Sequence, residues 1–341
     1  IRYLLVNDAT SAANTNVPVP TSPLYTNALL ITNTVQVRAR SFAPGLLPGT
    51  PASETYLAFN TNALKASSDL PMLVVHTLGG GDFNQSALKT AHLSVFEPVL
   101  GRTSLSSAPT VTTRAALRVR GNTSASSAKK SWTMETWDEF NDDKDVSLLD
   151  MPAESDWVLY GPASMEPVMI HNPFAYELAR RLGHWASRTR FVELYLNTTG
   201  GAITTNNYHG IYVLVEKVKL DHGRIDEERM EPEITQGPAL TGTYLMQVDR
   251  LESGEGGVQI PAVLPNTLSS GGNAITFTDP NESEILLPSR AAQRFYLRNY
   301  LTNFVNTLNS PGYADPVTGY SAYVNVAPSI NNHLVVTLCF S

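Results

Sequence analysis

Polar and basic residues gather around one glycine turn near the middle of the chain. They are Arg118, Arg120, Gly121, Asn122, Ser124, Lys129 and Lys130. The two arginines alternate on a predicted strand and share one of its faces, and the two lysines begin the next predicted strand. Glycine lets the backbone approach an anion closely, Asn and Ser supply neutral hydrogen bonds, and a lysine ammonium is a compact charge for a phosphate. The turn is therefore a candidate anion site. The alternative is a solvated hairpin with ordinary basic residues.

A second candidate is the pair Glu216-Lys217, which ends an otherwise apolar predicted strand. A carboxylate there can orient a lysine from a neighbouring strand, and such a Lys–Glu pair holds the phosphates of ATP in protein kinases. The alternative is a solvent-exposed strand end, which is the commoner situation for a Glu-Lys pair.

The motifs of several other enzyme classes are absent. The sequence contains no H-E-x-x-H, no G-x-S-x-G, no Walker loop, and neither the H-R-D nor the D-F-G motif of ordinary protein kinases. Three glycines at 79–81 follow a predicted strand, but the Lys-Ser/Thr of a phosphate loop does not follow them, so we predict a flexible turn. The seven histidines lack metal-ligand spacing, and we predict no metal site among them.

Composition narrows the class of protein further. The 341 residues include 24 basic and 31 acidic side chains, for a formal charge of −7, which gives no reason to expect binding to nucleic acid or to an anionic membrane surface, since both would call for a basic stripe. The single cysteine, Cys339, allows neither an intramolecular disulfide nor a cysteine-based metal site. No apolar run approaches the roughly 18 residues of a membrane span. We expect an exported protein without disulfides, and the start at Ile1 suggests a fragment or a processed product.

Periodic apolar residues outline the elements that position these side chains. Predicted strands span residues 27–32, 34–40, 54–59, 70–77, 93–96, 114–120, 131–137, 190–196, 210–219 and 242–248. Apolar residues at four-residue spacing predict a helix over 172–182, with Asn172 as its N-cap and Gly183 just beyond its end. A second helix is predicted over 290–308. The pattern is typical of an α+β fold of antiparallel strands with segregated helices.

The first 66 residues read as a separate, partial β-sandwich module. The spacing of Arg38, Ala39, Phe42, Gly45 and Pro48 resembles the end of the sandwich modules that accompany bacterial chitobiase-type enzymes. A generic set of β-strands is the alternative. We therefore predict an accessory module over residues 1–66 and a main domain over residues 67–341.

Several blocks of the main domain, in the same order along the chain, resemble the CotH-like (spore-coat protein H) kinase family. The matching blocks are Arg120–Ser124, Lys129–Trp132, Ser147–Pro152, Asp156–Leu159, His171–Gly183, Arg190–Asn197, Gly210–Glu216 and Gly242–Arg250. The resemblance runs from Leu70 to about His333. So many ordered blocks are a far more specific signal than one short motif.

This resemblance implies an atypical protein-kinase-like domain that transfers the γ-phosphate of ATP to Ser or Thr of exported or surface proteins, with Mg²⁺. By analogy Lys129 or Lys130 would contact the phosphates, and Glu216 would orient the lysine. Arg120, Asn122 and Ser124 would shape the phosphate-side loop. The alternative function is a non-catalytic structural or binding protein of the cell surface or a coat layer. A third, a polysaccharide-associated enzyme, lacks a pair of carboxylates for glycoside chemistry. A secreted or cell-surface location is expected, with neither nucleic acid nor a membrane span as a partner.

The sequence departs from the family pattern in two places. His171 stands where the family has arginine, and Glu166 where it has aspartate. Beyond the block matched by Ile330–His333, the family continues into N-x-D and W-D-x-D segments that carry its catalytic aspartates, whereas this chain reads Leu334–Ser341. No catalytic residue is identified, and the expectation at this point is a truncated chain with little or no kinase activity.

Overall fold

The computed structural model describes residues 1–7, 16–121, 124–162, 166, 168–249 and 274–329. It divides into two compact units, which are described separately. One comprises Ile1–Pro167 with Thr189–Lys217, and the other comprises Val168–Arg188 with Val218–Ser341. The boundary predicted after residue 66 does not coincide with this division and stays a prediction.

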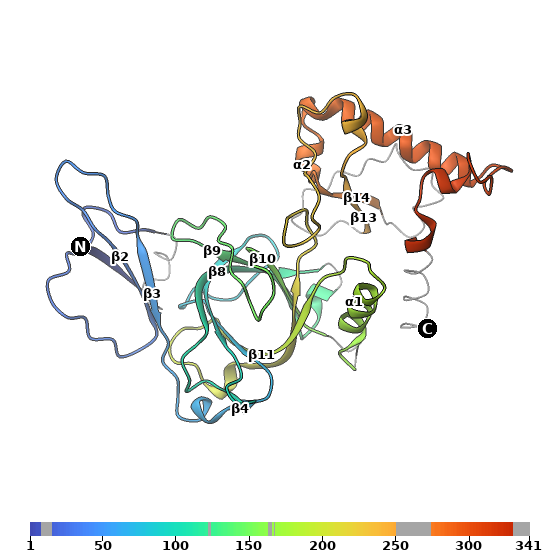
Figure 1. Ribbon diagram of the computed structural model, residues 1–341. Coiled ribbons are helices and arrows are strands. Elements are labelled where there is room, and N and C mark those ends of the chain that lie inside the picture. The colour runs from blue at the N-terminus through green and yellow to red at the C-terminus, as the bar shows by residue number, and fades with distance from the viewer. Residues whose placement is uncertain (8–15, 122–123, 163–165, 167, 250–273, 330–341) are drawn as a thin grey trace. The chain divides into compact units, whose positions relative to one another are not determined.

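The first unit is built around a closed barrel of seven strands (Figure 1). Its strands are β5 (Met72–His76), β6 (Lys89–Phe96), β8 (Val111–Arg120), β9 (Ser131–Trp137), β10 (Asp156–Tyr160), β11 (Thr189–Asn197) and β12 (Tyr208–Glu216). They follow one another around the barrel in the order β10-β12-β11-β5-β6-β8-β9, and β9 closes the barrel by pairing with β10. All these pairs are antiparallel except β5 with β11. The sheet-rich α+β character predicted from the sequence is confirmed, whereas closure into a barrel was not predicted.

Alternate residues of the strands fill the barrel interior, as period-two patterning requires. The interior cluster includes Leu73, Val75, Leu93, Val95, Leu117, Val119, Trp132, Met134, Trp157, Leu159, Leu194, Tyr212 and Leu214. Trp157 has no exposed surface and is the largest fully buried side chain. A second apolar cluster, which includes Met72, Val74, Phe96, Tyr195 and Ile203, packs on the outer face of β5, β6 and β11.

A row of buried polar side chains crosses the outer face of the barrel. His76 of β5 lies opposite His92 of β6, and His92 lies opposite Arg114 of β8. The three side chains are at most 3% exposed. The Nδ1 atom of His76 accepts a hydrogen bond from the Leu78 amide at 2.8 Å, and its Nε2 atom lies 3.0 Å from the Gly201 carbonyl oxygen. His76 is therefore held as the neutral tautomer that is protonated on Nε2.

The N-terminal segment forms a three-stranded antiparallel sheet with β2 (Val35–Arg40) between β1 (Arg2–Val6) and β3 (Ala52–Tyr56). The strand predicted over residues 27–32 is wrong. That stretch is an extended loop without a partner strand, and its Leu30 side chain is 88% exposed. Local β-propensity does not make a strand unless another strand supplies the ladder. Whether the sheet belongs to a sandwich module stays a prediction.

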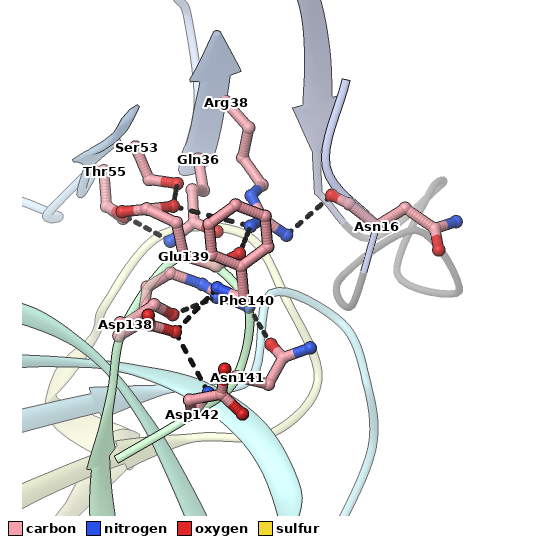
Figure 2. A network of polar contacts seen from close by, with 11 residues as sticks. Asn16, Gln36, Arg38, Ser53, Thr55, Asp138, Glu139, Phe140, Asn141 and Asp142 are labelled. Carbon is pink, nitrogen blue, oxygen red and sulfur yellow. Dashed lines mark hydrogen bonds and ion pairs between the residues drawn. The ribbon is translucent and has the colours of Figure 1, made fainter. Parts of the chain in front are cut away.

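Arg38 of β2 joins this sheet to the loop that follows β9 (Figure 2). Its guanidinium is completely buried and donates to the Asn16 carbonyl at 2.6 Å, to the Glu139 carbonyl, and to the Glu139 carboxylate at 3.4 Å. Ser53 of β3 donates to the same carboxylate. One buried arginine thus connects three segments that are far apart in the sequence.

Arg114 holds the same loop from the barrel side. It donates to the Asp138 carbonyl and to the Asn141 side-chain oxygen, both at 2.6 Å. Burial, and the positive charge of Arg38 nearby, lower the pKa of Arg114 to about 10. The loop 138–142 is therefore clamped between an arginine of the N-terminal sheet and an arginine of the barrel.

We expect Arg38→Met to lower the free energy of unfolding by about 2–3 kcal/mol, because it removes the donors that satisfy buried carbonyls and the charge that faces Glu139. Urea unfolding at pH 7 measures the change. Arg102→Met is the matched control, since Arg102 is exposed and its guanidinium donates to the Ser67 hydroxyl at 3.1 Å. Equal losses in the two variants would contradict a clamp at Arg38.

In its described part, the second unit holds three α-helices, α1 (His171–Arg181), α2 (Glu282–Ile285) and α3 (Ala291–Leu308), and a hairpin of β13 (Leu245–Asp249) with β14 (Ala274–Asp279). Phe277, Ile285 and Leu297 form a small apolar core between hairpin and helices. The helices predicted over 172–182 and 290–308 are confirmed. Within the described residues, no helix has the length and apolar character that crossing a membrane would require.

The prediction is confirmed at the C-terminal end of α1 and is wrong at its N-terminal end. Gly183 has φ +82° and its amide bonds the Arg180 carbonyl, while the His184 amide bonds the Ala179 carbonyl, which is the predicted glycine-terminated end. The predicted N-cap is wrong, because the helix starts at His171 and the capping position is Ile170, whose side chain makes no cap hydrogen bond.

Candidate phosphate-binding site

The connection from β8 to β9 contains most of the basic turn singled out in the sequence. Gly121 has φ +96°, a conformation that favours glycine, and a Cβ atom there would lie 2.1 Å from the Ser124 hydroxyl oxygen. Ser124 begins a single 3₁₀ turn, Ser124–Ser126, and the Gly121 carbonyl accepts a hydrogen bond from the Gln85 side chain at 2.8 Å. Asn122 lies outside the described residues. The Ser124 side chain therefore packs closely against Gly121.

Lys129 reaches from this connection to the start of β12. Its ammonium donates to the Ile211 carbonyl and lies 4.8 Å from the ring centre of Tyr212, a residue that is 1% exposed. Burial lowers the pKa of Lys129. An ammonium has three donors, so the carbonyl uses only part of its capacity.

Lys130 stabilises the turn by a hydrogen bond to its backbone. Its ammonium donates to the Ala125 carbonyl at 2.8 Å, which ties the start of β9 to the 3₁₀ turn. In the described part of the chain, neither Lys129 nor Lys130 forms an ion pair with a carboxylate. Within the described residues, two positive charges therefore lie at one end of the barrel, and each donates to a backbone carbonyl.

Gly161, which follows β10, belongs to the site although the sequence did not single it out. A Cβ atom at this position would lie 2.6 Å from the Lys130 carbonyl oxygen, 2.7 Å from Cε1 of Tyr212 and 3.2 Å from Cγ of Lys129. Its amide donates to the Ser131 hydroxyl at 3.0 Å. Only glycine allows the chain to pass this close to the lysines. No local pattern could have found it, because its role comes from pairing between β9, β10 and β12.

Arg118 and Arg120 lie on a different face of the barrel wall from the ammonium of Lys129. Arg118 lies opposite Thr133 and Arg120 opposite Ser131, so both arginines are on the outer face of the barrel wall, and both are half-buried. Lys129, by contrast, lies over the ring of Tyr212, which belongs to the interior core. The sequence predicted correctly that the arginines share one face, but that face is not the one on which the Lys129 ammonium is held.

The structure does not bring Glu216 to either lysine, which corrects the arrangement inferred from kinase Lys–Glu pairs. Strands β9 and β12 are both antiparallel to β10 and therefore run in the same direction. The lysines precede β9, whereas Glu216 ends β12 opposite Trp157. Ile211 and Glu216 are five positions apart on β12, which at about 3.3 Å per residue is roughly 17 Å. The sequence showed that Glu216 ends a strand, but not at which end of the barrel.

The neighbours of Glu216 differ from those expected of a solvent-exposed strand end. Glu216 is only 1% exposed. Lys217 forms an ion pair with Asp156 at 2.9 Å and is the last residue of the first unit. At the other end of β10, Glu166 is buried and accepts a hydrogen bond from the Tyr160 hydroxyl. His171, the other departure from the family pattern, is the first residue of α1.

The residues at the lysine end fit a phosphate better than a metal ion. Lysine ammonium groups, backbone amides and hydroxyls are donors to anions. Across the described residues, no group of three His, Cys, Asp or Glu side chains is close enough together to hold a metal ion. The lysine end therefore supplies positive charge suited to an anion, and ligands for Mg²⁺ are not assigned. The predicted block Ile330–His333 and the residues after it lie outside the described residues.

Comparison with known proteins places these features in a family. No curated protein matches the chain. The family model described as CotH kinase protein matches residues 117–341, well over half of the sequence. The matched segment includes the Gly121 turn, both lysines, Gly161 and Tyr212, and the predicted resemblance is confirmed. The chain belongs to the CotH kinase protein family.

Proposed function

We propose that this protein is a kinase-related protein that binds ATP through Lys129 and Lys130, on a domain whose reaction type is transfer of the γ-phosphate to Ser or Thr of exported or surface proteins; no catalytic residue of this chain is assigned to the transfer step. One observation carries the proposal: two ammonium groups lie at one end of the barrel without a carboxylate partner among the described residues, and one of them is partly desolvated. Membership of the CotH kinase protein family supports the reaction type and the surface or coat location.

The energetics of Lys129 favour an anionic ligand. Moving an ammonium out of water is unfavourable, and the lowered pKa of Lys129 is the sign of that cost. A phosphate oxygen that approaches the ammonium restores a favourable charge interaction in a setting less polar than water. Because the amine is already held by the Ile211 carbonyl and the Tyr212 ring, little side-chain freedom is lost when the ligand binds.

The remaining parts of the site have distinct tasks. Lys130 keeps the 3₁₀ turn in place, and the Gly121 turn lets backbone approach the phosphates closely. When bound, Mg²⁺ would supply positive charge that offsets the negative charge of the phosphates during transfer. Glu216 is not part of this phosphate site.

The proposal predicts a nucleotide-dependent rise in the melting temperature of the whole chain. We expect millimolar ATP with Mg²⁺ to raise the melting temperature of the wild type, because a ligand that binds the native state stabilises it. Lys129→Met should weaken the apparent affinity by about tenfold or more, which is the loss of one charge-assisted contact. Lys65→Met is the matched control, since Lys65 is exposed and distant in sequence, and it should behave as the wild type.

Two results would contradict the proposal: no shift in the wild type at millimolar nucleotide, or equal shifts in the wild type and Lys129→Met. A parallel assay of γ-phosphate transfer to a Ser- and Thr-rich acceptor protein reports on the reaction itself.

A second candidate function is a non-catalytic structural or binding protein of the cell surface or a coat layer. It is favoured by the hydrogen bonds that Lys129 and Lys130 make to backbone carbonyls, because such bonds hold the β8–β9 connection against β12 whether or not a ligand is present. Under this alternative Lys129→Met and Lys130→Met both lose stability and the wild type shows no response to nucleotide.

A further inference from the structure

The contacts of Lys129 show how its ammonium is held without losing its charge. Both contacts are neutral: the Ile211 carbonyl accepts a hydrogen bond, and the Tyr212 ring lies 4.8 Å away, within the range of a cation–π interaction. A carboxylate in either position would neutralise the ammonium. A carbonyl and an aromatic face orient the amine and leave its full charge available to an anion.

The ring beneath the ammonium is itself fixed in place. Tyr212 stacks on Trp132 with ring centres 5.3 Å apart and planes inclined by 29°. Tyr212 is 1% exposed and Trp132 is 4% exposed. Gly161 packs against the ring at Cε1, where a Cβ atom would lie 2.7 Å from that carbon. Since interiors are close-packed, a ring held on two sides has no alternative position.

The phenol adds no charge of its own. Burial raises the pKa of Tyr212, so the hydroxyl stays protonated across the physiological range. What the ring offers to Lys129 is therefore its π face, which Phe also has and an aliphatic side chain lacks.

We infer that Tyr212 is a positioning residue for Lys129: its buried ring holds the ammonium at the end of the barrel and so sets the affinity for phosphate groups. The inference rests on the proposed function only for the identity of the ligand. The position of the amine is a property of the protein alone and can be measured without nucleotide.

The test compares two substitutions of one side chain. Tyr212→Phe keeps the ring face, and we expect its affinity for ATP with Mg²⁺ to stay within about threefold of the wild type. Tyr212→Leu removes the ring, and we expect a loss of about tenfold, since cation–π interactions at desolvated sites are worth that much. Isothermal titration on the whole chain, well below the melting temperature of each variant, measures the affinities.

A matched variant separates positioning from stability. Leu214 has no exposed surface and lies two residues further along β12, in the same interior cluster, but it is not among the contacts of Lys129. Leu214→Ala should lower the melting temperature and leave the affinity unchanged. If Leu214→Ala weakens binding as much as Tyr212→Leu does, affinity follows stability and the inference is overturned.

A second readout needs no nucleotide. Acetic anhydride labels lysine amines, and mass spectrometry of the peptide containing Lys129 gives its rate of acetylation. We expect the Lys129 amine to react about threefold faster or more in Tyr212→Leu than in Tyr212→Phe, because the amine is no longer held against a ring. Equal rates would overturn the inference even if ATP binds. If the wild type does not bind ATP but the rates differ as expected, the proposed function fails and the positioning role stands.

Discussion

A polypeptide that begins at residue 117, where the family match begins, is expected not to fold into a cooperative structure. The match starts within β8, yet the barrel needs β5 and β6, which both precede it. Without β5, strand β11 loses its parallel partner, and without β6, strand β8 loses one of its two antiparallel partners. The interior also loses seven buried side chains, among them Leu73, Val75, Leu93 and Val95. At about 1.5–3 kcal/mol for each of these four, the loss is as large as the whole stability of a typical domain, about 5–15 kcal/mol.

The control is a polypeptide of residues 67–341, which keeps all seven strands and lacks β1–β3. We expect it to unfold cooperatively at a lower denaturant concentration than the full chain, because the loop 138–142 loses its contacts with Arg38. Far-UV circular dichroism during urea titration distinguishes the three polypeptides. Cooperative unfolding of residues 117–341 with the midpoint of the full chain would contradict the barrel described here. Folding of residues 67–341 would support the boundary predicted after residue 66.

Acid is expected to destabilise the protein over an unusually wide pH range because His92 is buried in the row of polar side chains on the outer face of the barrel. Burial lowers the pKa of His92 to about 3, and the adjacent His76 acts in the same direction. His92 faces His76 on one side and Arg114 on the other, and its Nε2 atom lies 2.8 Å from the Ser94 hydroxyl. Neither flanking residue is a carboxylate that could stabilise a charged imidazole.

The direction in which stability changes with pH follows from which state, folded or unfolded, binds more protons. Between pH 6.5, the ordinary pKa of histidine, and pH 3 the unfolded chain protonates this imidazole and the folded protein does not. Stability therefore rises with pH in this window and is lost as the pH falls through it, by at most about 1.4 kcal/mol per pH unit. The full effect over the window is several kcal/mol.

Urea unfolding of the wild type and of His92→Gln at pH 7.0 and 4.5 measures this contribution. We expect the variant to be less stable than the wild type at pH 7.0, and to lose less stability on acidification, because glutamine has no proton to gain. His222→Gln is the matched control, since the His222 side chain is 95% exposed, and it should retain the acid sensitivity of the wild type. An unchanged pH dependence in His92→Gln would assign the acid sensitivity to other groups.

The strands were largely predictable because burial on one face of a sheet leaves period-two alternation in the sequence. β9 was predicted with its observed bounds, and β2, β5, β11 and β12 within a few residues. Barrel closure could not be predicted in this way. It depends on the pairing of β10 with β12 and of β5 with β11, and both pairs join segments that lie far apart in the chain.

The candidate site was predictable only in part for the same reason. Residues close in sequence, such as Gly121, Ser124 and Lys130, were grouped correctly because one turn contains them. Glu216 was grouped with the lysines by chemical type, and the strand directions separate them. Gly161 and Tyr212 were missed because both contact Lys129 through strand pairing, which leaves no spacing signal in the sequence.

The most direct test of the central claim is a crystal structure of the full chain with Mg²⁺ and an ATP analogue that cannot be hydrolysed. The account predicts a phosphate oxygen within hydrogen-bond distance of Nζ of Lys129, with the ammonium still over the ring of Tyr212. A nucleotide bound elsewhere, with Lys129 unchanged in its contact with the Ile211 carbonyl, would contradict it.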